Sequence, residues 1–226
     1  MLWRVFSAEP QEGDSREVSR RKEGPLRLGI MISGRGSNMR AIVRAIDPGN
    51  LDARVAIVVC NHADAPGVAW ARARGLRAMV FERREFLSRD DQNHAMADAM
   101  KQAGVELVTM AGYDRLITGA VFSAFPQRIM NIHPSLLPAF PGTLHAQAQA
   151  LAHGVKVSGC TVHFVVEGEV DGGPIILQVA VPVLEGDTEE SLAARILQQE
   201  HVAYPRAVQL FAEDRLRIKE RRVRIL

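Results

Sequence analysis

Two polar side chains stand at the end of an apolar segment, in the sequence Asn131-Ile132-His133-Pro134. Residues two apart in a strand share a face, so Asn131 and His133 point the same way while Ile132 packs behind them. Pro134 cannot donate to a sheet ladder and ends the strand, which leaves the amide and the imidazole at its carboxyl end, where open α/β sheets bind ligands. The alternative is a histidine buried for structural reasons alone.

A carboxylate that could join them is Asp171, in the glycine-rich segment 167–174. An Asp in such a turn often only bonds its own backbone. An amide, an imidazole and a carboxylate from separate segments also fit acyl transfer through a tetrahedral intermediate. In that chemistry Asn131 and protonated His133 stabilise the oxyanion, and Asp171 keeps the imidazole charged and accepts a proton.

Two other chemistries have weaker support. The sequence has no GxSxG motif for a serine nucleophile, and Ser135, behind a proline, suits a turn. It has no HxxxH or HExxH spacing for a metal, and His163 alternates within a strand like an ordinary sheet residue. Cys60 and Cys160 lie in apolar runs, which favours buried thiols in a reducing compartment, although a bridge between them stays open.

An anion site is predicted at Gly34-Arg35-Gly36-Ser37-Asn38, between the first expected strand and the first expected helix. Backbone N–H groups of such a loop and of a helix N-terminus suit a phosphate. The loop has neither the third glycine of a dinucleotide fingerprint nor the lysine of a P-loop, which argues against NAD and against ATP hydrolysis. A glycine turn with a capping Ser or Asn is the structural alternative.

The elements that must position these residues alternate along the chain. Strands are expected at 26–33, 55–60, 77–81, 107–111 and 129–133, and helices at 39–46, 67–74, 89–104 and 118–125. Such alternation predicts an α/β fold: a mostly parallel, twisted, Rossmann-like sheet with helices on both faces. Two further β-rich runs, 156–166 and 175–183, predict antiparallel or mixed strands.

A long helix is expected to close the fold, with Asp187 as its cap and Glu190 completing a capping box. Leu192, Ile196 and Ala203 form its apolar stripe. Glu200 falls on the same stripe, so its carboxylate is expected to face inward, unless it lies at the boundary and reaches water.

Length and composition limit the class of protein and its domain organisation. The chain has 226 residues, 47% hydrophobic and 24% charged, with a formal net charge of +2, which fits one globular domain and gives no nucleic-acid footprint. We expect a flexible extension at 1–25, a domain at 26–214 and a basic tail at 215–226. No apolar run is long enough for a membrane span, so the expected location is cytoplasmic.

Together, the motifs ISGRGSN, AGYDR, NIHPSLLPAFPG, VDGGPIILQ and QQEHVAYP resemble those of the folate-dependent phosphoribosylglycinamide formyltransferases of purine synthesis, from about residue 26 to residue 211. The resemblance implies a formyltransferase fold and transfer of a formyl group from 10-formyltetrahydrofolate to the amine of glycinamide ribonucleotide, with no metal. It also implies small-molecule partners only, and a monomer or a homodimer.

The resemblance further assigns residues. Asn131, His133 and Asp171 match the catalytic trio of the family, and the ribonucleotide site matches Gly36, Ser37, Asn38 and Glu200. The folate pocket matches Arg115, Leu116 and the turn from Val166 through Glu167 to Asp171, with Arg89 at the tail carboxylates. Two departures affect the donor side: Asp114 stands where the family commonly has an apolar residue, and the segment 141–145 is a residue longer.

Three other functions fit the sequence less well. A relative that formylates methionyl-tRNA carries a further C-terminal domain, for which the chain has no room. A formyltetrahydrofolate deformylase uses water in place of the amine and carries an N-terminal regulatory domain, which residues 1–25 do not resemble. A module that only binds a phosphorylated ligand does not explain the polar trio.

Overall fold

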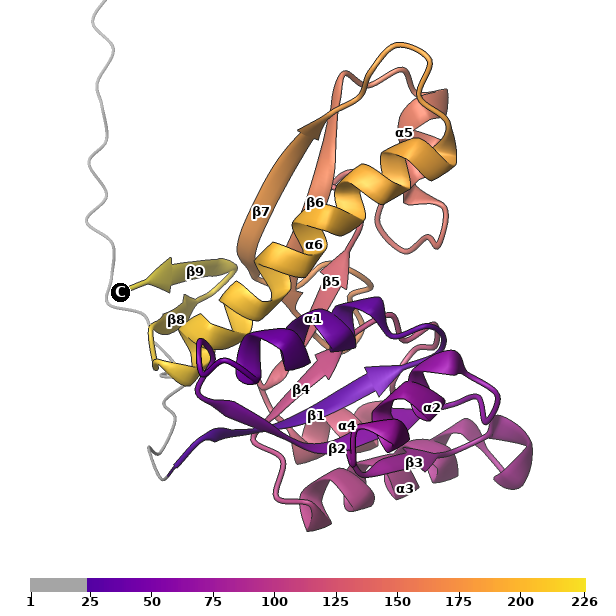
Figure 1. The fold of residues 1–226 in the computed structure, drawn as a ribbon, viewed down its shortest axis with the longest axis vertical. Coiled ribbons are helices and arrows are strands. Elements are labelled where there is room, and N and C mark those ends of the chain that lie inside the picture. The colour runs from indigo at the N-terminus through magenta and orange to yellow at the C-terminus, as the bar shows by residue number, and fades with distance from the viewer. Residues whose placement is uncertain (1–23) are drawn as a thin grey trace, which may run out of the picture.

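The strands within residues 24–226, the part of the chain described by the computed structural model, form one nine-stranded sheet. Its order is β3-β2-β1-β4-β5-β6-β7-β9-β8. The first five strands pair in parallel, and β6 runs antiparallel to both β5 and β7 (Figure 1). The strands are β1 Leu26–Ile32, β2 Ala53–Cys60, β3 Ala78–Val80, β4 Leu107–Met110, β5 Ile129–His133, β6 Val157–Phe164, β7 Ile175–Pro182, β8 Leu216–Lys219 and β9 Arg222–Ile225.

Helices cover both faces of the sheet. Apolar side chains of α1, α2, α5 and α6 join one buried cluster, and those of α3 and α4 join a second cluster on the opposite face. Alternate residues of β1 point into opposite clusters: Ile30 and Ile32 belong to the first and Met31 to the second. The helices are α1 Ser37–Ile46, α2 Pro66–Ala73, the 3₁₀ turn η1 Arg83–Glu85, α3 Arg89–Gln102, α4 Gly119–Ala124, α5 Ala146–Ala152 and α6 Glu189–Ala212.

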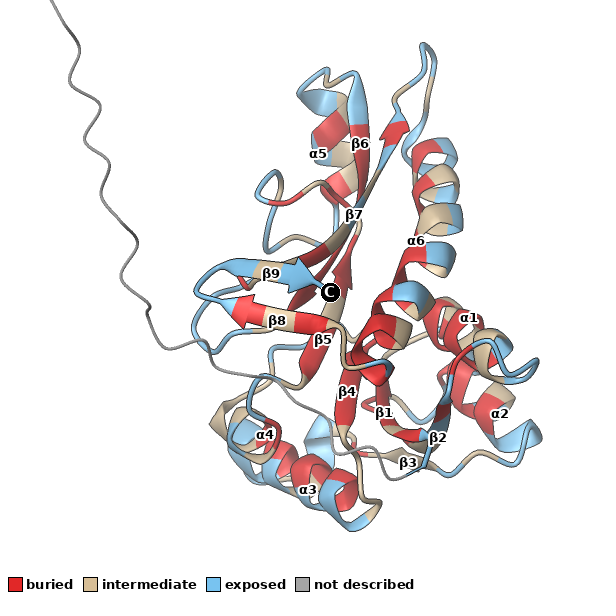
Figure 2. Ribbon diagram, turned by 90° about the vertical axis from the view of Figure 1, so that its left-hand side faces the viewer, coloured by how far each residue is buried: buried red, intermediate tan, exposed pale blue. Residues whose placement is uncertain are grey.

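The predicted α/β architecture is confirmed. The strands and helices expected before residue 134 are all present, with ends shifted by no more than two residues. The sequence pattern of these strands was clear because parallel strands are buried on both faces and are therefore apolar at nearly every position. Every residue of β4 is buried, and only one of the seven residues of β1 is partly exposed (Figure 2).

Chain direction across the sheet reverses between β1 and β4. The chain runs outward from β1 through β2 to β3, then returns to add β4 and β5 on the other side of β1. Loops that leave β1 and β4 at their carboxyl ends diverge at such a point and leave a crevice where open α/β sheets bind ligands. The loop after β1 is the predicted anion loop, so the topology sets it beside the ends of β4 and β5.

The end of the fold differs from the sequence-based prediction. Two strands, β8 and β9, follow α6, so the long helix does not close the fold and residues 215–226 are not a tail. Leu216 and Ile218 are buried while Arg217 and Lys219 are not, which is the alternation of a strand. The many basic residues made this alternation hard to recognise in the sequence. The sequence analysis also missed α5. The extension expected at 1–25 lies outside the described residues except for its last two, and the division into extension and domain stays a prediction.

The cap of α6 was also predicted wrongly. Thr188, not Asp187, caps the helix: its side chain accepts from the Ser191 backbone N–H, and the Ser191 hydroxyl accepts from the Thr188 N–H, so Ser191 rather than Glu190 completes the capping box. Asp187 instead receives two hydrogen bonds from the Arg195 guanidinium. A bidentate pair with arginine is a stronger use of a carboxylate than one capping bond.

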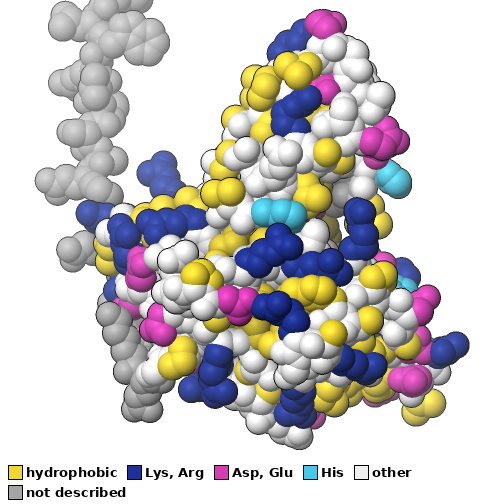
Figure 3. Space-filling model, in the orientation of Figure 1, with side chains coloured by type: hydrophobic (Ala, Val, Ile, Leu, Met, Phe, Trp, Pro, Cys, Tyr) yellow, Lys and Arg dark blue, Asp and Glu magenta, His cyan; other side chains and the backbone are white. Residues whose placement is uncertain are grey.

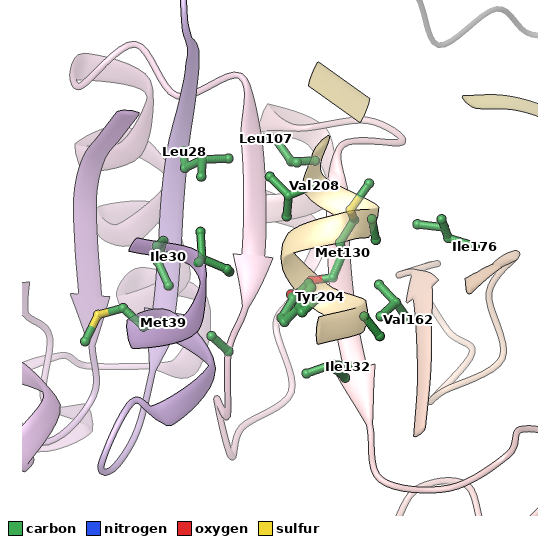
Figure 4. Close-up of a cluster of buried hydrophobic side chains, with 14 of the residues drawn as sticks. Leu28, Ile30, Met39, Leu107, Met130, Ile132, Val162, Ile176, Tyr204 and Val208 are labelled. Atoms are coloured by element: carbon green, nitrogen blue, oxygen red, sulfur yellow. The ribbon is translucent and has the colours of Figure 1, made fainter. Parts of the chain in front are cut away.

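Tyr204 of α6 ties the helix to the strands that carry the site. Its side chain is fully buried beside Met130 and Val208 (Figure 4). Its hydroxyl lies 2.9 Å from the Met130 carbonyl oxygen and 3.2 Å from that of Met110, so it can donate to either. Because Met130 directly precedes Asn131, this contact fixes the segment that positions the predicted trio.

We expect Tyr204→Phe to lower the free energy of unfolding by about 1–2 kcal/mol, because it removes the donor facing two buried carbonyls at almost constant volume. Tyr113→Phe is the matched control, since the Tyr113 hydroxyl faces the Met96 sulfur, a weak acceptor, at 3.6 Å. Urea unfolding of both variants measures the difference. Equal stability of the two variants would show that the Tyr204 hydroxyl adds nothing.

Candidate active site

Three polar side chains meet at the carboxyl end of β5. Asn131 and His133 lie on β5, and Asp171 comes from the segment that joins β6 to β7. One oxygen of Asp171, Oδ2, is 3.2 Å from His133 Nδ1. The other, Oδ1, accepts a hydrogen bond of 3.2 Å from the Asn131 amide. The carboxylate therefore bridges the amide and the imidazole that the sequence pattern selected.

Backbone geometry brings Asp171 to this position. Its φ is +51°, in the left-handed region that Asp tolerates better than most residues. Gly173 passes so close to β6 that a Cβ there would lie 1.8 Å from the Phe164 carbonyl oxygen. The glycines that follow Asp171 thus let the turn press against the strand and hold the carboxylate over β5.

Asp171 is a stable anion in this setting. Its burial alone would raise its pKa, but three effects oppose it: contact with His163, a hydrogen bond of 2.8 Å from the Gly142 backbone N–H, and the charge of His133. Together they lower the pKa of Asp171 to about 2. At neutral pH the carboxylate is ionised, although only 11% of its side chain is exposed.

A fourth side chain, His163, completes the cluster. It lies on β6 directly opposite Asn131 in the antiparallel register. Its Nδ1 lies 2.9 Å from the Phe164 carbonyl oxygen, and its Nε2 lies 3.4 Å from the Asn131 amide nitrogen and 3.5 Å from Asp171 Oδ1. Asp171 Oδ1 can only accept, so it faces the NH₂ end of Asn131, which fixes the amide orientation. Sequence analysis had taken His163 as an ordinary sheet residue, and only the register could have indicated its place.

Both ring nitrogens of His133 face oxygen atoms. Nδ1 faces Asp171, and Nε2 lies 2.8 Å from the Phe140 carbonyl oxygen, which can only accept. A neutral imidazole carries one N–H and would point a lone pair at one of these oxygens, whereas the imidazolium satisfies both. Each ring nitrogen of His133 therefore has an acceptor within reach.

The predicted anion loop has the expected form. Gly36 is the N-cap of α1 with φ +65°, and no side chain caps the helix. A Cβ at Gly36 would lie 2.8 Å from the Met39 side chain, so only glycine fits without a shift. Ser37 and Asn38 form the first turn, whose N–H groups have no partner within the helix and are available to an anion.

Asn38 also links this loop to Glu200. The two residues are 162 positions apart, yet the Asn38 amide donates a hydrogen bond of 2.8 Å to Glu200 Oε2. Burial raises the pKa of Glu200, and the bond from Asn38 opposes the rise only in part. The Asn38 amide oxygen is buried without a hydrogen-bond partner among the described residues. The expectation of an inward glutamate is confirmed, and its acceptor atoms suit a ligand that carries hydroxyl groups.

Two adjoining pockets lie on the other side of the trio. The first has a volume of about 310 Å³, and its walls include Asn131, His163, Asp171, Arg115, Leu116, Val166 and Glu167. The second, of about 390 Å³, shares Arg115 and Leu116 with the first and is also lined by Arg89. Every residue that was expected to contact a folate therefore lines one of two pockets that share wall residues.

Asp114, which was expected to stand in place of an apolar residue, follows β4 and contacts Ser33 in the loop after β1. Its Oδ1 accepts hydrogen bonds from the Ser33 hydroxyl at 2.9 Å and the Asn61 amide at 2.8 Å. Partial burial would raise the pKa of Asp114, but these bonds and the Arg115 charge lower it. The ionised side chain of Asp114 is therefore stabilised in this position by donors from neighbouring loops.

Within 24–226, no three His, Cys, Asp or Glu side chains are grouped to hold a metal ion, and none of the helices combines the length and the hydropathy of a membrane span. Cys60 and Cys160 are buried free thiols, as expected. Burial raises the pKa of both thiols, to about 12 for Cys160, so neither is a ready nucleophile.

Comparisons with known proteins point to one family. The family model described as "Formyl transferase" matches residues 26–208. The phosphoribosylglycinamide formyltransferase of Escherichia coli is 40% identical over 191 residues, which are 84% of this chain and 89% of that protein. A trifunctional purine biosynthetic protein of Drosophila pseudoobscura is 44% identical over 193 residues, but the match spans only 14% of its length.

Solved structures agree with the sequence matches. Glycinamide ribonucleotide transformylase 1 from Symbiobacterium toebii has 54% identity and a TM-score of 0.88, covering 94% of this chain and all of that one. A phosphoribosylglycinamide formyltransferase from Coxiella burnetii has 34% identity and a TM-score of 0.83, over 89% of this chain and 93% of its own. Since the family match runs from β1 into α6 and the same fold recurs at these identities, the chain belongs to the formyl transferase family.

Proposed function

We propose that the protein transfers the formyl group of 10-formyltetrahydrofolate to the amine of glycinamide ribonucleotide. The products are formylglycinamide ribonucleotide and tetrahydrofolate, as in de novo purine synthesis. The names of two similar proteins, described above, support this acceptor. The observation that carries the proposal is the position of the Asn131–His133–Asp171 trio between two different kinds of binding group.

One side of the trio suits the ribonucleotide. We assign Gly36, Ser37 and Asn38 to its phosphate, because their loop offers free N–H groups at a helix N-terminus. Glu200 is assigned to its hydroxyl groups as a buried acceptor. These residues come from the β1 loop and from α6, whose contact at Asn38 and Glu200 brings the two halves of the acceptor site together.

The other side suits the formyl donor. We assign the 310 Å³ pocket, bounded by Leu116 and Val166, to the flat pterin, and Arg115 and Arg89 to the carboxylates of its tail. Guanidinium groups bind carboxylates by two parallel hydrogen bonds, which suits this role. Glu167 and Asp171 border the same pocket and supply acceptors for pterin N–H groups.

In the proposed reaction the amine lone pair attacks the formyl carbon, a C–N bond forms, and the formyl oxygen becomes an oxyanion. Asn131 and protonated His133 stabilise this oxyanion by hydrogen bonds. The His133 Nε2–H is held by the Phe140 carbonyl. The formyl oxygen must therefore take the place of that carbonyl when the donor binds.

Asp171 assists the loss of a proton from the amine. With a pKa of about 2 it is a weak base at rest. The charge on His133 contributes to this low value, and the oxyanion partly neutralises that charge as it forms. The carboxylate thus becomes more basic at the moment when the proton leaves the amine. The proton then passes to N10 of the folate as the C–N10 bond breaks.

The direct test is tetrahydrofolate release from 10-formyltetrahydrofolate by the purified protein, with and without glycinamide ribonucleotide and with no metal added. We expect release only when the ribonucleotide is present. Release without it would identify a hydrolase. No release under either condition would contradict formyl transfer to this acceptor.

We expect His133→Ala and Asn131→Ala each to lower kcat by about a hundredfold or more, because each removes an oxyanion donor. His94→Gln, an exposed histidine on α3, is the matched control and should stay within threefold of the parent. Steady-state kinetics with both substrates measure the effect. Activity of His133→Ala within threefold of the parent would refute its assignment.

The lowered pKa of Asp171 also predicts a pH effect on stability. The unfolded chain binds this proton with a pKa near 3.8 and the folded chain with one of about 2, so stability is full above pH 5 and declines as pH falls toward 2. The total is about 2 kcal/mol, of which about half is lost by pH 3. Urea unfolding at pH 6 and pH 3 should show a smaller loss in Asp171→Asn than in the parent. Equal losses would contradict the ionised, paired carboxylate.

A further inference from the structure

The β8–β9 hairpin lies against the segment that carries Asp171. That segment comprises residues 165–174 between β6 and β7, which we call the donor turn because most of it lines the pocket assigned to the formyl donor. β9 joins the sheet beside it, since Arg222 pairs with Ile175, the first residue of β7. The family match ends at residue 208, so the hairpin lies beyond it, and nothing in the proposed reaction uses it.

Lys and Arg side chains gather over this hairpin (Figure 3), and Arg221 is one that reaches the donor turn. Its Nη1 donates a hydrogen bond of 3.0 Å to Glu169 Oε2, and its Nη2 donates one of 2.5 Å to the Gly172 carbonyl oxygen. These two acceptors belong to residues on either side of Asp171. A single guanidinium from the end of the chain therefore bridges the part of the turn that holds the catalytic carboxylate.

The donor turn has weak contacts of its own near its tip. The Glu169 N–H lies 3.3 Å from the Val166 carbonyl oxygen, and the Gly172 N–H lies 3.5 Å from that of Glu169, both long for hydrogen bonds. Residues 165–167 line the donor pocket and also a second pocket of about 290 Å³, whose walls include β8. Packing between the hairpin and the turn is therefore incomplete there. The bonds from Arg221 are shorter than the internal bonds of the turn.

Geometry, more than charge, gives this contact its role. The Arg221 side chain is 72% exposed, and exposed ion pairs contribute little. A planar guanidinium that holds two acceptors at once nevertheless fixes the distance between them. Glu169 and Gly172 are kept at a set separation, and Asp171 between them is kept in place.

We infer that Arg221 is a positioning residue for the proposed reaction: it joins Glu169 to Gly172 and so keeps Asp171 within reach of His133. The backbone of Asp171 has a φ of +51°, a sparsely populated conformation that persists only when its surroundings enforce it. Arg221 acts through the donor turn and not on the substrates. The inference rests on the proposed function, since it takes Asp171 as the catalytic carboxylate.

The test is steady-state kinetics of Arg221→Gln with each substrate varied in turn. We expect kcat to fall about threefold to tenfold, because a small displacement of a catalytic group lowers the rate steeply. The KM for 10-formyltetrahydrofolate should rise about twofold to fivefold, because a loosened turn weakens binding in the pocket that it lines. The KM for glycinamide ribonucleotide should not change, since its assigned residues lie on the β1 loop and α6. A mere loss of folded protein would lower kcat and leave both KM values unchanged.

Further variants assign the effect to the bridge. Arg221→Lys keeps the charge but ends in a single nitrogen, so it should recover only part of kcat. Arg224→Gln is the matched control, because Arg224 is exposed on β9 of the same hairpin, and its kinetics should equal those of the parent. Combining Glu169→Gln with Arg221→Gln should lower kcat by less than the product of the two single effects, as for residues that act as a pair.

Hydrogen–deuterium exchange of the free protein tests the contact without reference to activity. The backbone amides of residues 165–172 should exchange faster in Arg221→Gln than in the parent, because the turn opens locally more often. The amides of β1 and β4 should exchange as in the parent, which separates a loosened turn from a destabilised fold.

The possible results separate the two proposals. Parent-like kinetics and exchange in Arg221→Gln would overturn the inference and leave the proposed function untouched. Faster exchange with unchanged kcat and KM values would overturn the role in positioning. Parent-like kinetics in Arg221→Lys, or an equal defect in Arg224→Gln, would assign the effect to charge and reject the bridge. If the parent itself fails to formylate glycinamide ribonucleotide, the proposed function falls, and the exchange rates still decide whether Arg221 holds the turn.

Discussion

The site depends on keeping one buried carboxylate ionised. Without its partners, burial would raise the pKa of Asp171, because burial disfavours the charged form. The fold supplies donors from three places: His133 and Asn131 on β5, His163 on β6, and the Gly142 backbone N–H in the loop after β5. The ionised carboxylate in turn contacts both the His133 imidazole and the Asn131 amide. The positions of the three side chains and the charge of Asp171 therefore depend on the same set of contacts.

Sheet topology makes this arrangement possible. In a purely parallel sheet the strand after β5 would return through a crossover and run alongside it in the same direction. Here β6 runs antiparallel, which sets His163 against Asn131, and the following turn returns Asp171 to the same edge. The parallel half of the sheet, with its switch point between β1 and β4, supplies the anion loop. The site lies where the two halves meet, and α6 spans both through Tyr204 and Glu200.

The sequence predicted most elements well because buried strands are apolar, and for the same reason Asn131 and His133 stood out as polar residues at the end of such a strand. It failed where the deciding contact is between distant segments or where neighbours compete. His163 has the ordinary alternation of a strand, and only its register with Asn131 gives it a place in the site. Asp187 and Thr188 can both cap a helix, and the choice follows from Arg195, which pairs with Asp187. The β8–β9 hairpin after α6 was missed because its many basic residues suggested a solvent-exposed tail.

The Phe140 carbonyl that occupies His133 Nε2–H bears directly on how the proposed reaction gains its rate. When the formyl oxygen replaces that carbonyl, His133 exchanges one neutral carbonyl acceptor for another, so ground-state binding gains little from the exchange. As the amine attacks, the oxygen becomes an anion while the imidazolium stays in place, and the hydrogen bond strengthens. An interaction that is balanced in the ground state and stronger in the transition state raises kcat rather than substrate affinity. Because the Phe140 carbonyl already occupies His133 Nε2–H before the donor binds, the gain from this hydrogen bond appears in the chemical step and not in substrate binding.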